Sequence, residues 1–180
     1  MQLKNYNFLI LSCAFTTQAQ YGGNRNFRNQ RQSQIPQPQQ EAPEPNFNIK
    51  RYIGIVVYDI EKTAKKSSVK LSSKEGKEFS KVLTKYNKNI KDITRINTFL
   101  LRSTKDMIDN FQKSSMKSGD FSNQSKVQKT MEENLKPILE TLKVEDLKLN
   151  TTMKTLLSEK QHKKWIKYNK KIFKTFPEDN

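Results

Sequence analysis

The sequence predicts an all-α protein, an elongated bent helical hairpin of three to four helices preceded by a disordered N-terminal tether. From residue 46 to the end there are three Gly and two Pro, and Lys, Leu, Glu and Gln abound, a composition typical of helices. No Asn-Gly or Asp-Gly pair marks a β-hairpin turn. Hydrophobic residues make up 33% of the 180 residues, below the globular norm of roughly 45–50%, which favours thin packing.

Residues 1–19 have the layout of a secretory signal peptide. Lys4 precedes an apolar run from Phe8 to Phe15, and a polar stretch ending at Ala19 follows. The run is far shorter than the ~20 residues that span a bilayer. Two alternatives are weaker: an N-terminal core helix would be isolated by the segment that follows it, and a lipobox ending at Cys13 is poorly matched by bulky Leu11. We therefore expect cleavage after Ala19, a periplasmic or secreted location and no membrane anchor.

Residues 20–48 are rich in Asn, Gln, Arg and Pro, and four of the six prolines fall within ten residues. Such a segment buries too little apolar area to offset the entropy lost on ordering. We expect a disordered tether, and its net charge of +1 favours a spacer over a binding tail.

The remaining residues, 49–180, are expected to form a single helical domain that begins with a helix over 49–66. Apolar residues recur there at steps of three and four. The β-branched run at 53–58 is also compatible with a strand. We favour the helix because no second strand is available to pair with that run.

The second predicted helix, 73–114, has the clearest pattern in the chain. Its heptad seam is polar only at Asn97 and Thr104 and comprises Phe79, Leu83, Tyr86, Ile90, Ile93, Asn97, Leu100, Thr104, Met107 and Phe111. At 1.5 Å per residue this helix is roughly 60 Å long. It therefore needs partner helices along its length, and we expect a homodimer.

Two further helices complete the prediction. Gly119 suits a C-cap, so a break is expected at 116–123. A third helix follows at 124–156, where Pro137 should kink it or start a new segment. The fourth, 159–174, presents Gln161, Trp165, Tyr168 and Ile172 on one side.

Two nine-residue segments share one pattern, L-S-x-K-[E/Q]-x-K-x-aromatic, at 71–79 and 157–165. Each is predicted to be a capping box, in which the Ser hydroxyl at the N-cap accepts from the N3 amide and the Glu or Gln side chain at N3 accepts from the N-cap amide. The preceding Leu is placed for a hydrophobic staple. The box residues are Leu71, Ser72 and Glu75 in the first copy, and Leu157, Ser158 and Gln161 in the second.

With these two boxes, the chain resembles the LTxxQ-motif family of periplasmic proteins, the Spy- and CpxP-like envelope chaperones and stress adaptors. Leu157-Ser158-x-x-Gln161 matches the motif with Ser in place of Thr, and Leu71-Ser72-x-x-Glu75 also has Glu in place of Gln. The resemblance implies a long bent hairpin that pairs into a cradle-shaped dimer. It also implies binding of unfolded or aggregating clients without nucleotide, and it supplies no catalytic site.

Charge is the other strong signal. The chain carries 34 basic and 18 acidic residues, a net charge of +16, and residues 158–174 hold seven Lys against one Glu. Three interpretations apply: a solvated face that maintains solubility, a surface that steers acidic or unfolded clients, and a binder of anionic polymers or lipid headgroups. The excess of Lys over Arg argues against specific nucleic-acid readout.

No enzymatic chemistry is predicted. One His and one Cys exclude a Cys/His zinc cluster, and adjacent acidic pairs such as Glu145-Asp146 lie on different sides of a helix. We expect no catalytic residue, metal or cofactor.

The expected function is that of a nucleotide-independent, chaperone-like or stress-adaptor binding protein with unfolded or acidic protein clients. The alternative is an electrostatic binder of anionic envelope polymers or lipid headgroups without chaperone activity. The candidate client- or dimer-facing surface comprises Phe79, Tyr86, Lys163, Lys164, Trp165, Lys167 and Tyr168.

Overall fold

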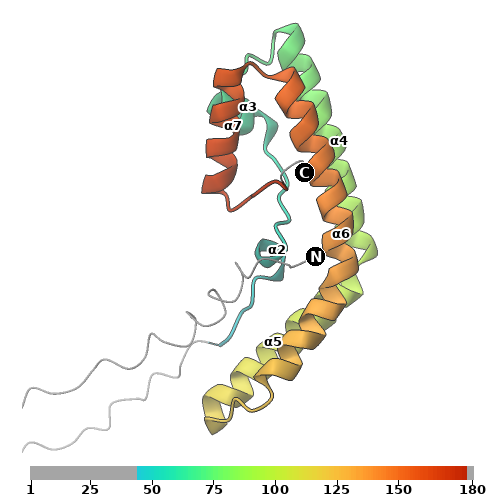
Figure 1. The fold of residues 1–180 in the computed structure, drawn as a ribbon, viewed down its shortest axis with the longest axis vertical. Coiled ribbons are helices and arrows are strands. Elements are labelled where there is room, and N and C mark those ends of the chain that lie inside the picture. Colours follow the sequence, from blue (N-terminus) through green and yellow to red (C-terminus); the bar gives the residue numbers. More distant parts are fainter. Residues whose placement is uncertain (1–43, 178–180) are drawn as a thin grey trace, which may run out of the picture. The chain divides into compact units, whose positions relative to one another are not determined.

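A computed structural model describes residues 44–177, and every regular element there is a helix (Figure 1). The expected signal peptide, 1–19, and residues 20–43 of the expected tether lie outside the described residues. The prediction of an all-α fold is confirmed, but the described residues form six helices rather than three or four: α2 (Ile49–Tyr52), α3 (Ile60–Ser67), α4 (Lys74–Ile96), α5 (Thr98–Ser118), α6 (Gln124–Leu156) and α7 (Glu159–Lys171).

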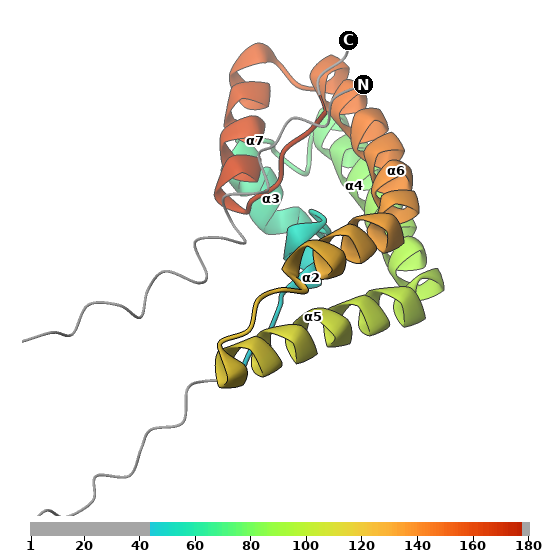
Figure 2. The same cartoon turned by 60° about the horizontal axis from the view of Figure 1, so that its bottom comes forward.

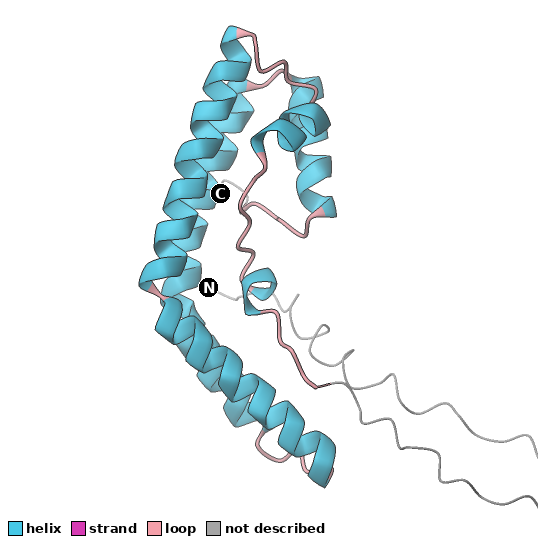
Figure 3. Cartoon of the chain, turned by 180° about the vertical axis from the view of Figure 1, so that it is seen from behind, coloured by secondary structure: helices cyan, strands magenta, loops and turns pink. Residues whose placement is uncertain are grey.

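The predicted helix over 49–66 is wrong, because α2 and α3 are separate and the residues between them are extended (Figure 3). A Schellman motif ends α2, with Gly54 at a φ of +70° and the Ile55 amide donating to the Lys50 carbonyl at 2.9 Å. The extended segment needs no partner strand. The Asn87 side chain of α4 accepts from the Tyr58 amide and donates to the Tyr58 carbonyl, both at 2.8 Å.

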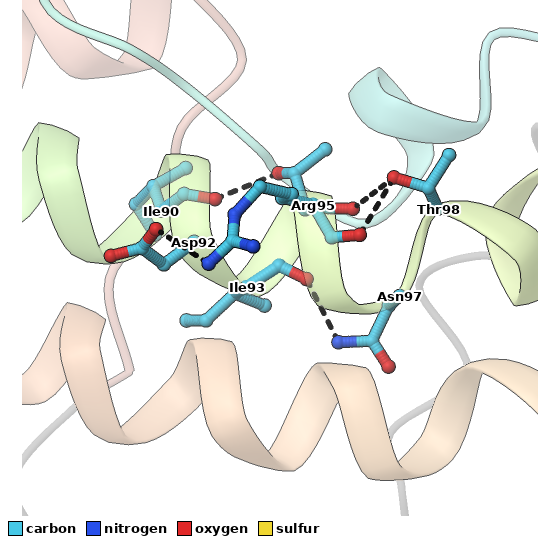
Figure 4. A network of polar contacts seen from close by, with 7 residues as sticks. Ile90, Asp92, Ile93, Arg95, Asn97 and Thr98 are labelled. Atoms are coloured by element: carbon cyan, nitrogen blue, oxygen red, sulfur yellow. Dashed lines mark hydrogen bonds and ion pairs between the residues drawn. The ribbon is translucent and has the colours of Figure 1, made fainter.

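The predicted helix over 73–114 is interrupted at Asn97, which separates α4 from α5 (Figure 4). The Asn97 side-chain amide donates to the Ile93 carbonyl at 2.8 Å. The Thr98 hydroxyl donates to the carbonyls of Thr94 and Arg95 at 3.0 and 2.9 Å. These side chains compete with backbone amides for the carbonyls of the last turn of α4, a known cause of helix bending.

The buried face also changes register along these two helices. On α5 the buried positions include Leu101 and Ile108, whereas the predicted seam residues Leu100 and Met107 are only partly buried. A helix of 3.6 residues per turn drifts by about 20° per heptad against a 3.5-residue repeat. Over the four heptads that follow Phe79 the drift is large enough that Ile108 is closer than Met107 to the direction of Phe79.

The bounds predicted for the third helix are confirmed, and α6 continues through Pro137. Helix α6 and the α4–α5 pair bend at the same level, as two hydrogen bonds between them show. Thr104 accepts from Asn134 on one side of this level, and Asn89 donates to Glu145 on the other. Pro137 and Asn97 both fall between these pairs, and Figures 1 and 3 show α6 bending together with α4 and α5.

Helix α6 packs against α4 and α5, while α3 and α7 pack against each other beside α4 (Figure 2). Gly119 ends α5 with a φ of +72°, as predicted for a C-cap. The fourth predicted helix ends earlier than residue 174, since α7 stops at Lys171. The core gathers between these layers and includes Phe79, Leu83, Ile90, Leu135, Ile138, Met153 and Trp165.

Residues 44–48, which the composition assigns to the tether, contact α5. The Phe47 amide donates to the Asp109 carboxylate at 2.8 Å, and Glu44 pairs with Lys113 at 2.6 Å. The Phe47 ring also lies 5.4 Å from that of Tyr52 in α2. The contacts of the helical domain therefore include residues before 49, because Asp109 supplies an acceptor that composition cannot reveal.

Candidate functional site

Helix α4 begins one residue later than predicted. Ser73, not Ser72, is its N-cap and accepts from the Gly76 amide at 3.0 Å; Ser72 is exposed. The first turn lies so close to the preceding chain that a Cβ at Gly76 would be 1.9 Å from the Lys70 carbonyl oxygen. With Gly76 at N3, Glu75 cannot close a capping box, so that part of the prediction is wrong.

The second capping box is confirmed, and it contacts the first motif. Ser158 accepts from the Gln161 amide, and the Gln161 side chain accepts from the Ser158 amide at 2.9 Å. The same Gln161 side chain donates to Glu75 at 2.7 Å. Leu157 is buried and Leu71 partly buried against the core. The two motifs, 86 positions apart, therefore join the beginnings of α4 and α7.

Three aromatic residues expected on the client surface are in the core instead. Phe79 and Trp165 are fully buried, and Tyr86 is nearly so. The Trp165 ring lies 5.1 Å from Tyr58 and 6.1 Å from Phe79. The prediction failed because these rings follow the helical period that faces inward. Tyr168 is partly buried against the same core. Phe79, Trp165, Tyr58 and Tyr86 are called the aromatic cluster below.

A buried ion pair lies beside the aromatic cluster. Lys174 is 2% exposed, and its ammonium group lies 2.6 Å from the Asp146 carboxylate and 2.8 Å from the Gly54 carbonyl oxygen. The other Asp146 oxygen accepts from the Tyr86 hydroxyl at 2.7 Å. This network connects α4, α6, the turn that ends α2 and the chain that follows α7.

Burial perturbs every titratable member of this network. Desolvation raises the pKa of Asp146, against the opposing effects of Lys174 and the Tyr86 hydrogen bond. Desolvation likewise lowers the pKa of Lys174, against the attraction of Asp146. Burial also raises the pKa of Tyr86, with a further contribution from the Asp146 charge. The charged pair is therefore held against a desolvation cost.

The sequence interpretation missed this network. Asp146 occupies an inward position of α6 between Leu142 and Leu149, so a carboxylate on an otherwise apolar face was the available signal. Lys174 had no signal, because it is one of seven lysines between residues 158 and 174 and nothing in the local sequence distinguishes it from the exposed ones. Asn169, also buried in α7, accepts from the Tyr58 hydroxyl at 2.5 Å.

The lysines predicted for α7 are exposed. Lys163 pairs with Glu159 at 2.5 Å, and Lys164 donates to the Ser68 hydroxyl at 2.7 Å. Lys167 is also exposed, as are Lys160, Lys170 and Lys171. This side of α7 is accordingly cationic, while Trp165 and Asn169 face inward.

A longer cationic face lies on α4 and was not singled out from the sequence. Seven exposed basic residues follow one another at steps of three and four, so they share one side of the helix; they are Lys74, Lys77, Lys81, Lys85, Lys88, Lys91 and Arg95. They extend over about 32 Å at 1.5 Å per residue. We call this set the lysine face.

Few acidic groups neutralise the lysine face. Lys81 pairs with Glu78 at 2.7 Å and Arg95 with Asp92 at 3.4 Å, and the other five form no ion pair with a described acidic residue. Together α3, α4 and α7 carry 16 basic and 5 acidic residues, whereas α5 and α6 carry 10 and 7. The positive potential is therefore concentrated on the first group of helices.

The described residues offer little that resembles a catalytic or metal site. Within 44–177 no group of three or more His, Cys, Asp and Glu side chains is placed to hold a metal ion. An open depression of about 320 Å³ is lined by residues of α5 and by Glu44 and Pro45. Two of its three carboxylates already accept from neighbours: Asp109 from the Phe47 amide and Lys105, and Glu44 from Lys113. The third, Asp106, pairs with Arg102 at 3.9 Å.

Among the described helices, none combines the length and the apolar character needed to cross a bilayer. No family model matches the chain. No curated protein and no solved structure matches it either. The function must therefore be inferred from the geometry of the chain itself.

Proposed function

We propose that this chain is an exported, nucleotide-independent helical binding protein that holds unfolded or acidic protein clients, as an envelope chaperone or stress adaptor does. The lysine face of α4 is the observation that carries the proposal. Five of its seven cations form no ion pair with a described acidic residue, so their field is available to attract negatively charged chains.

Two apolar side chains beside the lysine face supply a short-range contact. Ile96 is 73% exposed and Phe99 83% exposed, at the break between α4 and α5. Long-range attraction by the lysines followed by weak apolar contact suits a protein that binds many unfolded chains loosely. These two residues replace the buried aromatic cluster as the apolar part of the proposed surface.

The joined motifs support placing the chain beside the LTxxQ-motif family. Gln161 closes the capping box of α7 and also bonds Glu75, so the pattern fixes a helix junction here. The proposal includes a bent hairpin that associates as a cradle-shaped homodimer. Sedimentation at tens of micromolar should then give twice the monomer mass, and a compact monomer would contradict this part.

The decisive experiment neutralises the lysine face. In one variant Lys77, Lys88 and Lys91 become Gln; in a matched control Lys126, Lys136 and Lys143 of α6 become Gln. All six are exposed and outside the ion pairs described, and the net charge changes equally. Light scattering of a denatured client should show suppression of aggregation by the wild type and the control, and about a tenfold weaker effect of the α4 variant, which loses three charge contacts.

The alternative function, an electrostatic binder of anionic polymers or lipid headgroups, differs from the chaperone proposal in the salt dependence of binding and in the ligands bound. Vesicles of anionic phospholipid and polyphosphate chains would bind with an affinity that falls steeply with salt concentration, without any preference for unfolded protein. An absence of client protection by the wild type at low salt would overturn the chaperone proposal. Equal losses in the two variants would show that net charge, not the lysine face, is responsible.

A further inference from the structure

The last described segment of the chain, residues 172–177, forms no helix (Figure 3) and contacts Trp165 and Asp146. We call it the strap. The Phe176 ring stacks on Trp165 with centroids 5.8 Å apart and an interplanar angle of 24°. Lys174 enters the core to reach Asp146 and Gly54. Phe173 remains 63% exposed, and the guanidinium carbon of Arg51 lies 3.7 Å from the centroid of its ring.

Three features of the closed strap are unfavourable in themselves. Phe173 has a φ of +60°, a left-handed conformation that is strained for a bulky side chain. Lys174 and Asp146 are both charged groups removed from water. The Trp165 indole nitrogen, fully buried, has no hydrogen-bond partner among the described residues, and such groups are rare in native proteins.

Opening the strap would relieve all three. Phe173 could return to an ordinary φ, Lys174 and Asp146 could be hydrated, and the Trp165 indole could donate to water. The losses on opening are the ring stack of Phe176, the ion pair itself, the bond from Lys174 to the Gly54 carbonyl and the contact of Phe173 with Arg51. A six-residue segment held in this way is more easily released than one held by apolar contacts alone, because its opening recovers solvation.

We propose that the strap is an autoinhibitory cover, and that its release exposes Trp165 and its neighbours as a second, aromatic client site. This inference rests on the proposed client-binding function. The occupant that the geometry fits is an unfolded segment whose aromatic side chain takes the position of Phe176 on Trp165. A neighbouring basic residue of that segment could replace Lys174 beside Asp146.

Trp165 is the only tryptophan of the chain, so its fluorescence reports on this site alone. Phe176→Ala removes the stacking ring and should loosen the strap while the helices remain. We expect red-shifted emission, easier quenching by acrylamide and unchanged helical circular dichroism. If the strap is open in about one in a thousand wild-type molecules, the client affinity should rise by ~10-fold or more, up to a limit of ~1,000-fold. Phe121→Ala, at the α5–α6 turn, is the matched control and should change neither readout.

Hydrogen exchange of the wild type provides a test that needs no variant. The Lys174 amide, which donates to the Asn169 carbonyl at 2.9 Å, should exchange faster than the amides inside α7. Exchange of Lys174 only through global unfolding would overturn the proposal, because the strap would then not open by itself.

The client measurements separate the two proposals. Accessible Trp165 with unchanged client affinity would overturn the cover and leave binding by the lysine face intact. Stronger binding by Phe176→Ala that persists when Lys77, Lys88 and Lys91 are Gln would support the aromatic site independently of the lysine face. Accessible Trp165 with no client binding by any form would overturn both.

Discussion

The α4 and α5 arms lie along the same helix, α6, but the chain covers them differently. The inner face of α4 contacts α6 and also residues of α7 and of the 53–59 segment, as in the Phe79–Trp165 and Tyr58–Tyr86 ring pairs. The buried residues of α5 are Leu101, Thr104, Ile108 and Ser115, half of them polar. A third layer makes the α4 region thick enough to bury aromatic rings completely and to exclude water from an ion pair.

The ion pairs of the two regions also differ in burial, and therefore in their effect on stability. Lys174 and Asp146 are buried, so desolvation dominates their behaviour. On α5 the pair of Arg102 and Asp106 lies at the surface, with nitrogen and oxygen 3.9 Å apart. Pairs of that kind contribute about 0–1 kcal/mol, so the same residue types have different consequences in the two arms.

The largest expected effect tests the buried ion pair of the thick region. Lys174→Ala leaves Asp146 buried without its counter-ion, so the free energy of unfolding should fall by about 3–5 kcal/mol. Urea denaturation followed by circular dichroism measures it. The double variant Asp146→Asn with Lys174→Met removes both charges but keeps an acceptor for the Tyr86 hydroxyl, so it should lose less stability than Lys174→Ala. A loss below ~1 kcal/mol for Lys174→Ala would show that the pair is solvated.

The next largest effect is expected for Leu→Ala substitutions, which can be made in both α4 and α5. Leu83→Ala in α4 removes a fully buried side chain, and Leu101→Ala in α5 removes one that is 5% exposed. We expect losses near 4 and near 2 kcal/mol, the upper and lower parts of the range for Leu→Ala, because the thin arm can collapse onto its cavity. Equal losses in urea denaturation would contradict the difference in cover.

Gly→Ala substitutions at two positions test how closely the backbone is packed at the start of α4 and at the end of α5. Gly76→Ala places a Cβ 1.9 Å from the Lys70 carbonyl oxygen, so the α4 entry must shift and stability should fall by about 2 kcal/mol. Gly119→Ala meets nothing within 4 Å and suffers only from its positive φ, which costs about 1 kcal/mol. A larger thermal destabilisation by Gly119→Ala than by Gly76→Ala would contradict the close approach.

The smallest effect concerns His162, the only histidine. Desolvation, and then repulsion by Lys154, lower its pKa. A histidine whose pKa is lowered on folding stabilises the folded state at high pH, and this contribution is lost as the pH falls through the folded-state pKa.

The wild type should therefore lose slightly more stability than His162→Gln between about pH 7.5 and pH 5, by less than about 0.5 kcal/mol because the residue is only partly buried. The difference between the two proteins is the readout, since Asp146, with a raised pKa, has the opposite sign. A larger loss in His162→Gln would show that the histidine pKa is raised instead.

Much of the fold could be predicted from local pattern. The bounds of α6, the Ser158–Gln161 box and the Gly119 cap all depend on residues close in sequence. The candidate site was predicted only in part, since the exposed lysines of α7 were found but the aromatic residues were assigned to the surface. Periodicity identifies one face of a helix, yet it does not say whether that face meets solvent, a client or another helix.

The sequence by itself determined that the described chain is helical, where α6 begins and ends, and that its surface is rich in lysine, because these depend on composition and on steps of three and four. Only the tertiary structure decided that α2 and α3 are separate, because the bonds that replace a helix there come from Asn87, 29 residues away from Tyr58. It also decided that Lys174 is the buried lysine, because only the packing of four distant segments removes that one ammonium group from water.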